Sequence, residues 1–284
     1  MTQSAFETWL LEAPLWQIAL AMLLSMVAAS LIGWRLRMRY RPSRDKTNEA
    51  ESGSQEGYIF SATLGLLALL TGFTFSIAID RFDTRRERVL IEANAIGTTY
   101  LRAQLLDEPH RSRISALLRD YIDTRLELAD AGPAERKALL QRNDRLVTDL
   151  WTATVAAFPA IKNYDFSTSF LETMNLVIDM DTARKVARRA HIPTGVLLVL
   201  FFYQLVTAAV LGYVLSGRTG RIVAILLFVL FGVSVLLIID IDRPTSGSIR
   251  ESQDAIVQVR DLLHTQPPAT FDRFNSPGPA PPPR

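Results

Sequence analysis

The stretch from Ala62 to Arg102 constrains this chain more than any other. Its first half is an apolar run long enough to cross a bilayer, and its second half is charged, yet no proline interrupts the helical periodicity between them. An uncharged apolar run of this length is typical of a membrane-spanning helix, and the next proline is Pro109. The sequence therefore predicts one long helix that leaves the membrane and continues through Asp80 to about Leu106.

Three further apolar segments are long enough to span a membrane. About 20 helical residues at ~1.5 Å each cover a hydrocarbon core of ~30 Å. With 49% apolar residues, this chain of 284 residues is too apolar for a typical soluble domain and too polar to lie wholly in a membrane. We expect four spans, at Leu15–Trp34, Tyr58–Ile79, Pro193–Leu215 and Ile222–Ile239.

A charged, helix-periodic portion separates the second and third spans. It runs to about residue 190, with breaks expected at Pro109, Gly132-Pro133 and Pro159. Residues three or four positions apart, all apolar except Arg125, predict buried stripes in its first two segments. They are Leu117, Leu118, Tyr121, Ile122, Arg125 and Leu126, and then Leu139, Leu140, Val147, Leu150, Val155 and Phe158. No β-pattern competes with this. The predicted fold class is all-α, a polytopic membrane protein with four transmembrane helices and a helical extramembrane bundle between the second and third.

The predicted organisation has six parts along the chain. A Gly/Ser-containing stretch at 45–57 is expected to be a flexible linker, and the Pro-rich end is expected to be disordered. The parts are the first span with its basic linker (1–57), the second span and its extension (58–107), the bundle (108–190), a hairpin of the third and fourth spans (191–244), an amphipathic helix (245–265) and the tail (266–284).

Charge predicts the orientation in a bacterial inner membrane. Four spans place both termini on the same side as the bundle. The short loops 35–57 and 216–221 contain eight Lys or Arg, which favours the cytoplasm for those loops and the periplasm for the termini and bundle. Arginines at the two ends of the bundle favour the opposite orientation. Because long domains translocate with little regard to charge, we give the short loops more weight.

Charged residues should gather where the second span ends, the third begins and the fourth ends, because these points meet the same membrane face. Charges at such a boundary pair with one another or line a water-filled vestibule. We expect a collar of Asp–Arg pairs, with structural salt bridges and an ion vestibule as alternative roles. Its members are Asp80, Arg81, Arg184, Asp240, Asp242 and Arg243.

The second span itself carries small and polar residues. Ser61 and Gly65 form a small-xxx-small pair, with Gly72 a further heptad along, which is suited to close helix contact. A polar cluster among aromatic residues near a charged exit is also typical of a pore-lining helix with an apolar constriction. The candidate lining residues are Thr71, Phe73, Thr74 and Ser76. The alternative is that the hydroxyls bond to their own helix carbonyls at i−4. Beyond the span, Arg81, Arg85, Arg88 and Glu92 share one helical face, where they could pair with one another.

Motifs for catalysis are missing from the sequence. There is no cysteine, the three histidines are scattered, and no phosphate-binding glycine loop, nucleophile elbow or metalloprotease pattern occurs. We therefore predict no enzymatic activity, no cofactor and no metal site. The net charge of +2 gives no reason to expect a nucleic-acid partner.

Three segments together resemble the bacterial bestrophin-like-domain family of integral membrane proteins. They are LLTGFTFSIAIDRFDTRRERVLIEANAIGTTYLRAQLL, then MNLVIDMDTARKVARRAHIP, then IDIDRP, and the likeness extends from about Tyr58 to Arg250. The positions that carry the motif are Glu92, Asn94, Gly97, Asn175, Asp179, Pro193 and Pro244. The resemblance implies a distant likeness to bestrophins, pentameric anion channels with four spans per subunit. It also implies a cytoplasmic bundle, in contrast to the charge of the loops.

The functional prediction is an oligomeric ion channel with the second span lining the pathway, and the family resemblance implies anion selectivity. Its expected partners are membrane lipid, further copies of the same chain and small inorganic ions. The alternative is a non-conducting scaffold or sensor whose bundle binds a partner.

Overall fold

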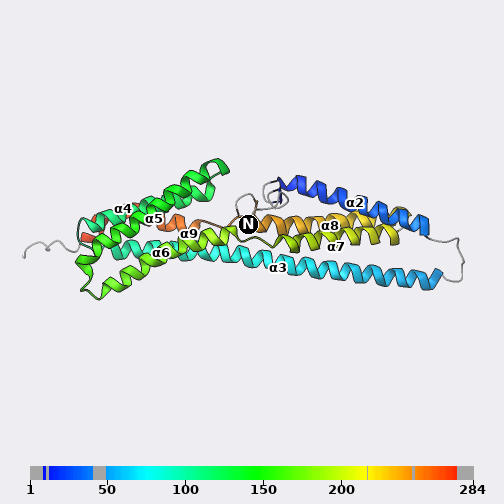
Figure 1. Cartoon of the computed structure of the whole chain (residues 1–284), viewed down its shortest axis with the longest axis horizontal. Coiled ribbons are helices and arrows are strands. Elements are labelled where there is room, and N and C mark those ends of the chain that lie inside the picture. Colours follow the sequence, from blue (N-terminus) through cyan, green and yellow to red (C-terminus); the bar gives the residue numbers. More distant parts are fainter. Residues whose placement is uncertain (1–8, 11–12, 41–48, 216, 245–246, 274–284) are drawn as a thin grey trace, which may run out of the picture. The chain divides into compact units, whose positions relative to one another are not determined.

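The computed structural model describes residues 9–10, 13–40, 49–215, 217–244 and 247–273, and it leaves out the side chains of 49–56 and 133. These residues form helices and contain no strand, which confirms the all-α prediction (Figure 1). The elements, labelled as in Figure 1, are α2 (Leu15–Tyr40), α3 (Glu49–Ala103), α4 (His110–Asp130), α5 (Pro133–Ile161), α6 (Phe166–Arg189), α7 (Thr194–Val214), α8 (Gly217–Asp242), α9 (Asp254–Thr265) and the 3₁₀ helix η1 (Pro268–Asp272).

The chain divides into two compact units. The membrane unit comprises residues 1–82 and 190–250, and the bundle unit comprises residues 83–189 and 251–284. Helix α3 contributes its first part to the membrane unit and its last part to the bundle unit. Four helices are long and apolar enough to cross a membrane, as predicted, and they contain the expected spans in α2, α3, α7 and α8.

In the membrane unit, α2, α7 and α8 pack side by side (Figure 1). Helix α2 buries Ile18, Met22 and Met26, which recur every fourth residue and so lie on one face. The apolar part of α3 packs through Leu67 and Ala78 into a core shared with α7 and α8. Many outward-facing residues of these helices are large and apolar, as lipid contact requires.

Two glycines set how closely α2 and α7 approach. A Cβ atom at Gly33 would lie 1.9 Å from the carbonyl oxygen of Ala209, and one at Gly212 would lie 2.0 Å from that of Ser30. The two helices therefore touch backbone to backbone, as is common where small residues line a membrane helix interface. The close contact expected at Gly65 is not made by the described residues, because beyond the helix's own backbone none of their atoms lies within 4 Å of a Cβ built at Gly65 or Gly72.

The bundle unit has its own apolar core, built from α3, α4, α5, α6 and α9. The predicted stripe of α4 is largely confirmed, since Leu118, Tyr121 and Ile122 are buried. The predicted stripe of α5 is partly wrong, because Val155 and Phe158 are exposed while Ala153, Ala157 and Ile161 face the core. Two alanines, and not Val155 and Phe158, point inward in this part of α5, which hydrophobicity alone does not reveal.

Several helix ends differ from the prediction. Helix α2 continues through the basic segment to Tyr40, α3 begins at Glu49 inside the expected linker, and α8 continues to Asp242. Each extension consists of residues that tolerate helix and continue one already formed. Pro159 lies inside the last turn of α5 and does not end it. Residues 41–48 lie outside the described residues.

The start of the Pro-rich tail is folded, contrary to expectation. Tyr100 donates a hydrogen bond of 2.7 Å to the carbonyl of Gln266, and its ring meets Phe271 edge-on with centroids 6.4 Å apart. Arg111 forms an ion pair of 2.8 Å with Asp272. These contacts hold η1 against the bundle core. Residues 274–284 lie outside the described residues.

Candidate functional site

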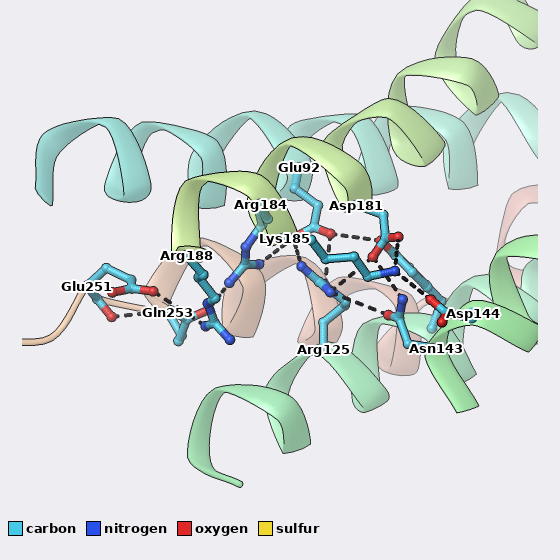
Figure 2. A network of polar contacts seen from close by, with 11 residues as sticks. Glu92, Arg125, Asn143, Asp144, Asp181, Arg184, Lys185, Arg188, Glu251 and Gln253 are labelled. Atoms are coloured by element: carbon cyan, nitrogen blue, oxygen red, sulfur yellow. Dashed lines mark hydrogen bonds and ion pairs between the residues drawn. The ribbon is translucent and has the colours of Figure 1, made fainter. Parts of the chain in front are cut away.

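The bundle unit contains a largely buried network of charged and polar side chains, which we call the Glu92 network. Glu92 lies on α3 between Val89 and Ile96, so helical periodicity points its carboxylate into the apolar core, and it is 0% exposed. A buried carboxylate is stable only if it is paired and hydrogen-bonded. The network consists of Arg85, Glu92, Tyr121, Arg125, Asn143, Asp144, Asp181, Arg184, Lys185, Arg188, Glu251 and Gln253, most of which Figure 2 shows.

Two arginines from different helices meet at Glu92. Arg125 of α4 places its Nε 2.9 Å from one carboxylate oxygen, and Arg184 of α6 pairs with the other (Figure 2). The hydroxyl of Tyr121 donates to Glu92 over 2.8 Å. The expected pairing of Glu92 with the arginines of its own helix therefore does not form in this way, because burial turns it toward α4 and α6.

The network extends from Arg125 to α5. Asp181 accepts from Arg125 over 3.2 Å and from Asn143 over 2.8 Å. Lys185 contacts Asp181 over 2.6 Å and Asp144 over 2.5 Å. Helices α3, α4, α5 and α6 each contribute to one connected set of contacts, which fixes their register in the bundle.

At its other end the network reaches the segment before α9. Arg184 donates to Gln253 over 3.2 Å, and Arg188 lies 3.4 Å from Glu251, which is also 3.9 Å from Arg85. Five cationic side chains in the network thus face four carboxylates, since Asp144 and Asp181 add to Glu92 and Glu251.

The pKa values of Glu92 and Arg188 are shifted by burial and by the charges of their neighbours. Burial raises the pKa of Glu92, but the charges of Arg125 and Arg184 outweigh burial, so the pKa is lowered overall. Burial and the neighbouring charge of Arg184 lower the pKa of Arg188 to about 10. Glu92 is therefore ionised at neutral pH. Arg188 is also charged at neutral pH, but its charged form is less favourable in the folded protein than in water.

A second group of buried charges lies in the membrane unit, at the end of α8. Asp242 accepts the backbone NH of Ile192 at 3.0 Å, just before α7 begins. Asp240 accepts the backbone NH of Ser248 at 2.7 Å and also its hydroxyl, while Arg243 donates to the carbonyl of Leu10. These residues tie together the chain segments that adjoin the spans.

These contacts involve only some of the residues of the collar that the sequence predicts. Asp240, Asp242 and Arg243 are buried together with backbone partners, whereas Asp80 is exposed and Arg81 is half-buried. Arg184 belongs to the bundle unit and pairs with Glu92. One collar of all six residues stays a prediction. Periodicity marked Arg125 as a buried position, but nothing in the sequence indicated its partners.

The pore-lining candidates divide between two faces of α3. Thr74 is 2% exposed, and both Thr71 and Thr74 donate to carbonyls four residues earlier, which are Leu67 and Leu70. Phe73 is 61% exposed, and Ser76 is also exposed. The two threonines thus follow the alternative of bonding within the helix.

The remaining motif positions lie mostly at surfaces. Asn94, Asn175 and Asp179 are exposed, and Gly97 packs against Val259 of α9, with 3.5 Å between a built Cβ and the valine. Pro193 precedes α7 as its N-cap residue, and Pro244 follows α8. Among the residues that the structure describes, no three His, Asp or Glu side chains are grouped to hold a metal ion.

The fold defines the class, a four-span membrane protein with a helical bundle held by buried ion pairs. A sequence model of the Bestrophin-like domain matches residues 22–256, so the chain belongs to this family. A crystal structure of a bacterial bestrophin homologue from Klebsiella pneumoniae, in a single-substitution variant, has a TM-score of 0.66 at 15% identity, covering 89% of this chain and 98% of that one. Another variant of that homologue gives 0.62 at 16% identity, with 87% and 98% covered. A third structure, described as a membrane protein, gives 0.61 at 15% identity, with 86% and 98% covered. No protein with a curated description matches the chain.

Proposed function

We propose that this protein is an oligomeric ion channel whose pathway is lined by the membrane part of α3. One observation carries the proposal. The most buried residues in the membrane part of α3 are Leu67, Thr74 and Ala78, and the described part of the chain leaves the opposite face exposed. At 100° per residue, roughly one third of the circumference, centred on that exposed face, carries small and polar residues together with two large apolar ones. The small and polar residues are Ser61, Gly65, Gly72, Ser76 and Asp80, and the apolar ones are Leu69 and Phe73.

This composition supports a water-filled path better than contact with lipid. Polar residues inside a membrane are expensive, and they usually face another helix or a cavity. Leu69 and Phe73 lie one turn apart on the same face and would supply an apolar constriction. Phe73 and Ser76 therefore stay in the proposed lining. Thr71 and Thr74 are left out of it, because their hydroxyls donate to carbonyls of their own helix. Family membership supports the same class of function.

The charge of this exposed face of α3 favours cations. Asp80 ends the stripe, and Asp83 and Glu87 follow at i+3 and i+7 on the same helix and are also exposed. A ring of carboxylates at a pore mouth attracts cations. We therefore propose cation preference, in place of the anion preference that the family resemblance implied.

Assembly is supported by an exposed apolar stripe on α5. Trp151, Val155 and Phe158 recur at i, i+4 and i+7 in the unit that lies outside the membrane, and all three are exposed. We propose that further copies of the chain cover this stripe. The same stripe favours the second candidate, a scaffold or sensor that binds a different protein there.

Purified protein in planar bilayers tests the channel. Phe73→Ala should increase the single-channel current by removing the constriction. Phe202→Ala is a matched control, since Phe202 is equally exposed, at 62%, but lies on α7. In a salt gradient, Asp80→Asn should shift the reversal potential toward zero if cations permeate. Absence of any current, together with a monomeric state of the purified protein, would contradict the channel proposal and favour the scaffold or sensor.

Orientation is tested by a phosphatase fusion at Gly132, which the loop charges predict to be active in the periplasm. Activity only of a cytoplasmic reporter at the same site would favour the orientation implied by the family.

A further inference from the structure

A cavity of about 330 Å³ lies in the membrane unit, between the end of α2, the end of α7 and the start of α8. Its floor is apolar and buried, with Leu211 and Ala224. Its rim includes Leu31 and Trp34, both substantially exposed, so the cavity opens at a surface that faces the bilayer. None of these residues belongs to the Glu92 network or to the exposed face of α3.

The cavity exists because of the close contact between α2 and α7. Gly212, part of the lining, rests against the backbone of Ser30, so the two helices meet without side chains to fill the space beside them. Helix α8 begins only at Gly217, and its first turn completes the wall. The volume is at the lower end of the range for ligand pockets, enough for a headgroup or one stretch of acyl chain.

The charge around the cavity is of one sign. Arg221 is the one charged residue in the lining that the structure describes, and it is exposed. Arg37 lies close by, because it donates to the carbonyls of Tyr213 and Val214 over 2.6 and 2.7 Å. Helices α2 and α7, and α8 up to Ile239, contain no Asp or Glu. The same end of these helices also carries Arg35, Arg39 and Arg218.

The depth of the cavity indicates an amphiphilic occupant. Trp34 ends the apolar run of α2, and the arginines begin at the next residue, so the cavity spans the boundary between hydrocarbon and headgroups. An apolar floor below a cationic rim at this level matches a phospholipid with a negative headgroup. A free inorganic anion would leave the apolar floor unfilled.

We propose that this cavity is a binding site for an anionic phospholipid, with the phosphate near Arg221 and part of an acyl chain on Leu211 and Ala224. The site does not depend on the proposed channel, since a scaffold with the same membrane unit would have it too.

Trp34 can report occupation directly. The other tryptophans, Trp9, Trp16 and Trp151, are replaced by Phe, and the full chain is reconstituted in vesicles of phosphatidylcholine. Phosphatidylglycerol brominated on its acyl chains should quench Trp34 at a mole fraction about fivefold lower than brominated phosphatidylcholine, the effect of about one Arg charge near the headgroups. Arg221→Gln should remove this preference. Arg39→Gln, which removes the same charge at the same membrane face but outside the lining, should keep most of it.

Four results would overturn the proposal. Equal quenching by the two lipids, or a preference that survives Arg221→Gln, would show that the cavity does not select a negative headgroup. Loss of the preference on adding soluble glycerol phosphate would indicate a site for a free anion. No quenching of Trp34 by either lipid would show that another subunit covers the cavity. Arg221→Gln should remain folded, because Arg221 is exposed and makes only a weak contact within its own helix. Circular dichroism of each variant checks that the helices are intact.

Discussion

The membrane unit and the bundle unit hold their helices together by different means. In the membrane unit, α2 and α7 meet through glycine, with carbonyl oxygens where side chains would otherwise lie. In the bundle unit, the helices surround an apolar core into which a carboxylate and several arginines are inserted. Helices in lipid gain nothing from hiding apolar surface, so close backbone contact is what remains. Helices in water already have apolar burial, so the ion pairs add positional specificity at a cost.

Among the substitutions that test this comparison, Glu92→Gln should have the largest effect on stability. It leaves Arg125 and Arg184 buried with too little opposing charge, which we expect to destabilise the bundle unit by about 3–5 kcal/mol. Because the chain has no native cysteine, thiol labelling of Ala153→Cys, a buried position of α5, can follow unfolding of this unit in urea. Glu87→Gln, exposed on the same helix, is the control. A loss no larger than that of the control would mean that the network does not stabilise the bundle.

The same carboxyl predicts a dependence on pH. Its pKa is lowered in the folded protein from an ordinary value of 4.5, despite burial, by Arg125 and Arg184. A carboxyl with a lowered folded pKa stabilises fully above its unfolded pKa and loses that contribution as the pH falls through the folded value. The difference in unfolding free energy between wild type and Glu92→Gln should therefore be constant between about pH 7 and pH 5 and shrink in stronger acid. A difference that shrinks already near neutral pH would contradict this assignment.

Gly212→Ala should have the next largest effect, confined to the membrane unit. The added methyl group would overlap the carbonyl oxygen of Ser30, so α2 and α7 must separate, at a cost of about 1–3 kcal/mol. Labelling of Ala208→Cys, buried on α7, measures this unit. Gly195→Ala on the same helix has open space around its Cβ and should be harmless. Equal stability of the two variants would mean that the helices do not touch at Gly212.

Arg188→Met should change the stability of the bundle unit in the opposite direction to Glu92→Gln. Burial and Arg184 lower the pKa of Arg188 to about 10. Below that pH Arg188 is charged, and burying this charge lowers the free energy of unfolding. Removing it should stabilise the bundle unit by about 1 kcal/mol, while Glu251 keeps its contact with Arg85. The Ala153→Cys labelling assay measures the change. A loss of stability would show that the Arg188–Glu251 pair outweighs the cost of burying the charge.

The smallest effect is expected for Arg142→Gln. Arg142 and Glu127 form an ion pair of 3.3 Å, but their side chains are 45% and 48% exposed, so water screens it. We expect a loss of less than about 0.5 kcal/mol in the same assay. A loss approaching that of Glu92→Gln would remove the distinction between buried and exposed pairs on which the comparison rests.

Hydrophobicity and periodicity alone determined the all-α class, the four spans and the long helix from the second span, because each depends on composition within a single segment. The family likeness was also carried by local motifs such as the one around Glu92. Helix ends were less predictable, since an extension such as that of α2 to Tyr40 continues an existing helix at little cost.

Contacts between distant residues required the tertiary structure. The partners of Glu92 lie 33 and 92 positions away, and nothing local marks Arg125 or Arg184 as the pair that meets it. The close approach at Gly33 and Gly212, and the cavity beside it, depend on two helices separated in the chain by α3 and the bundle. The long helix that dominates the sequence was predictable from its own residues. Which of its faces is buried was decided only by the helices that pack against it.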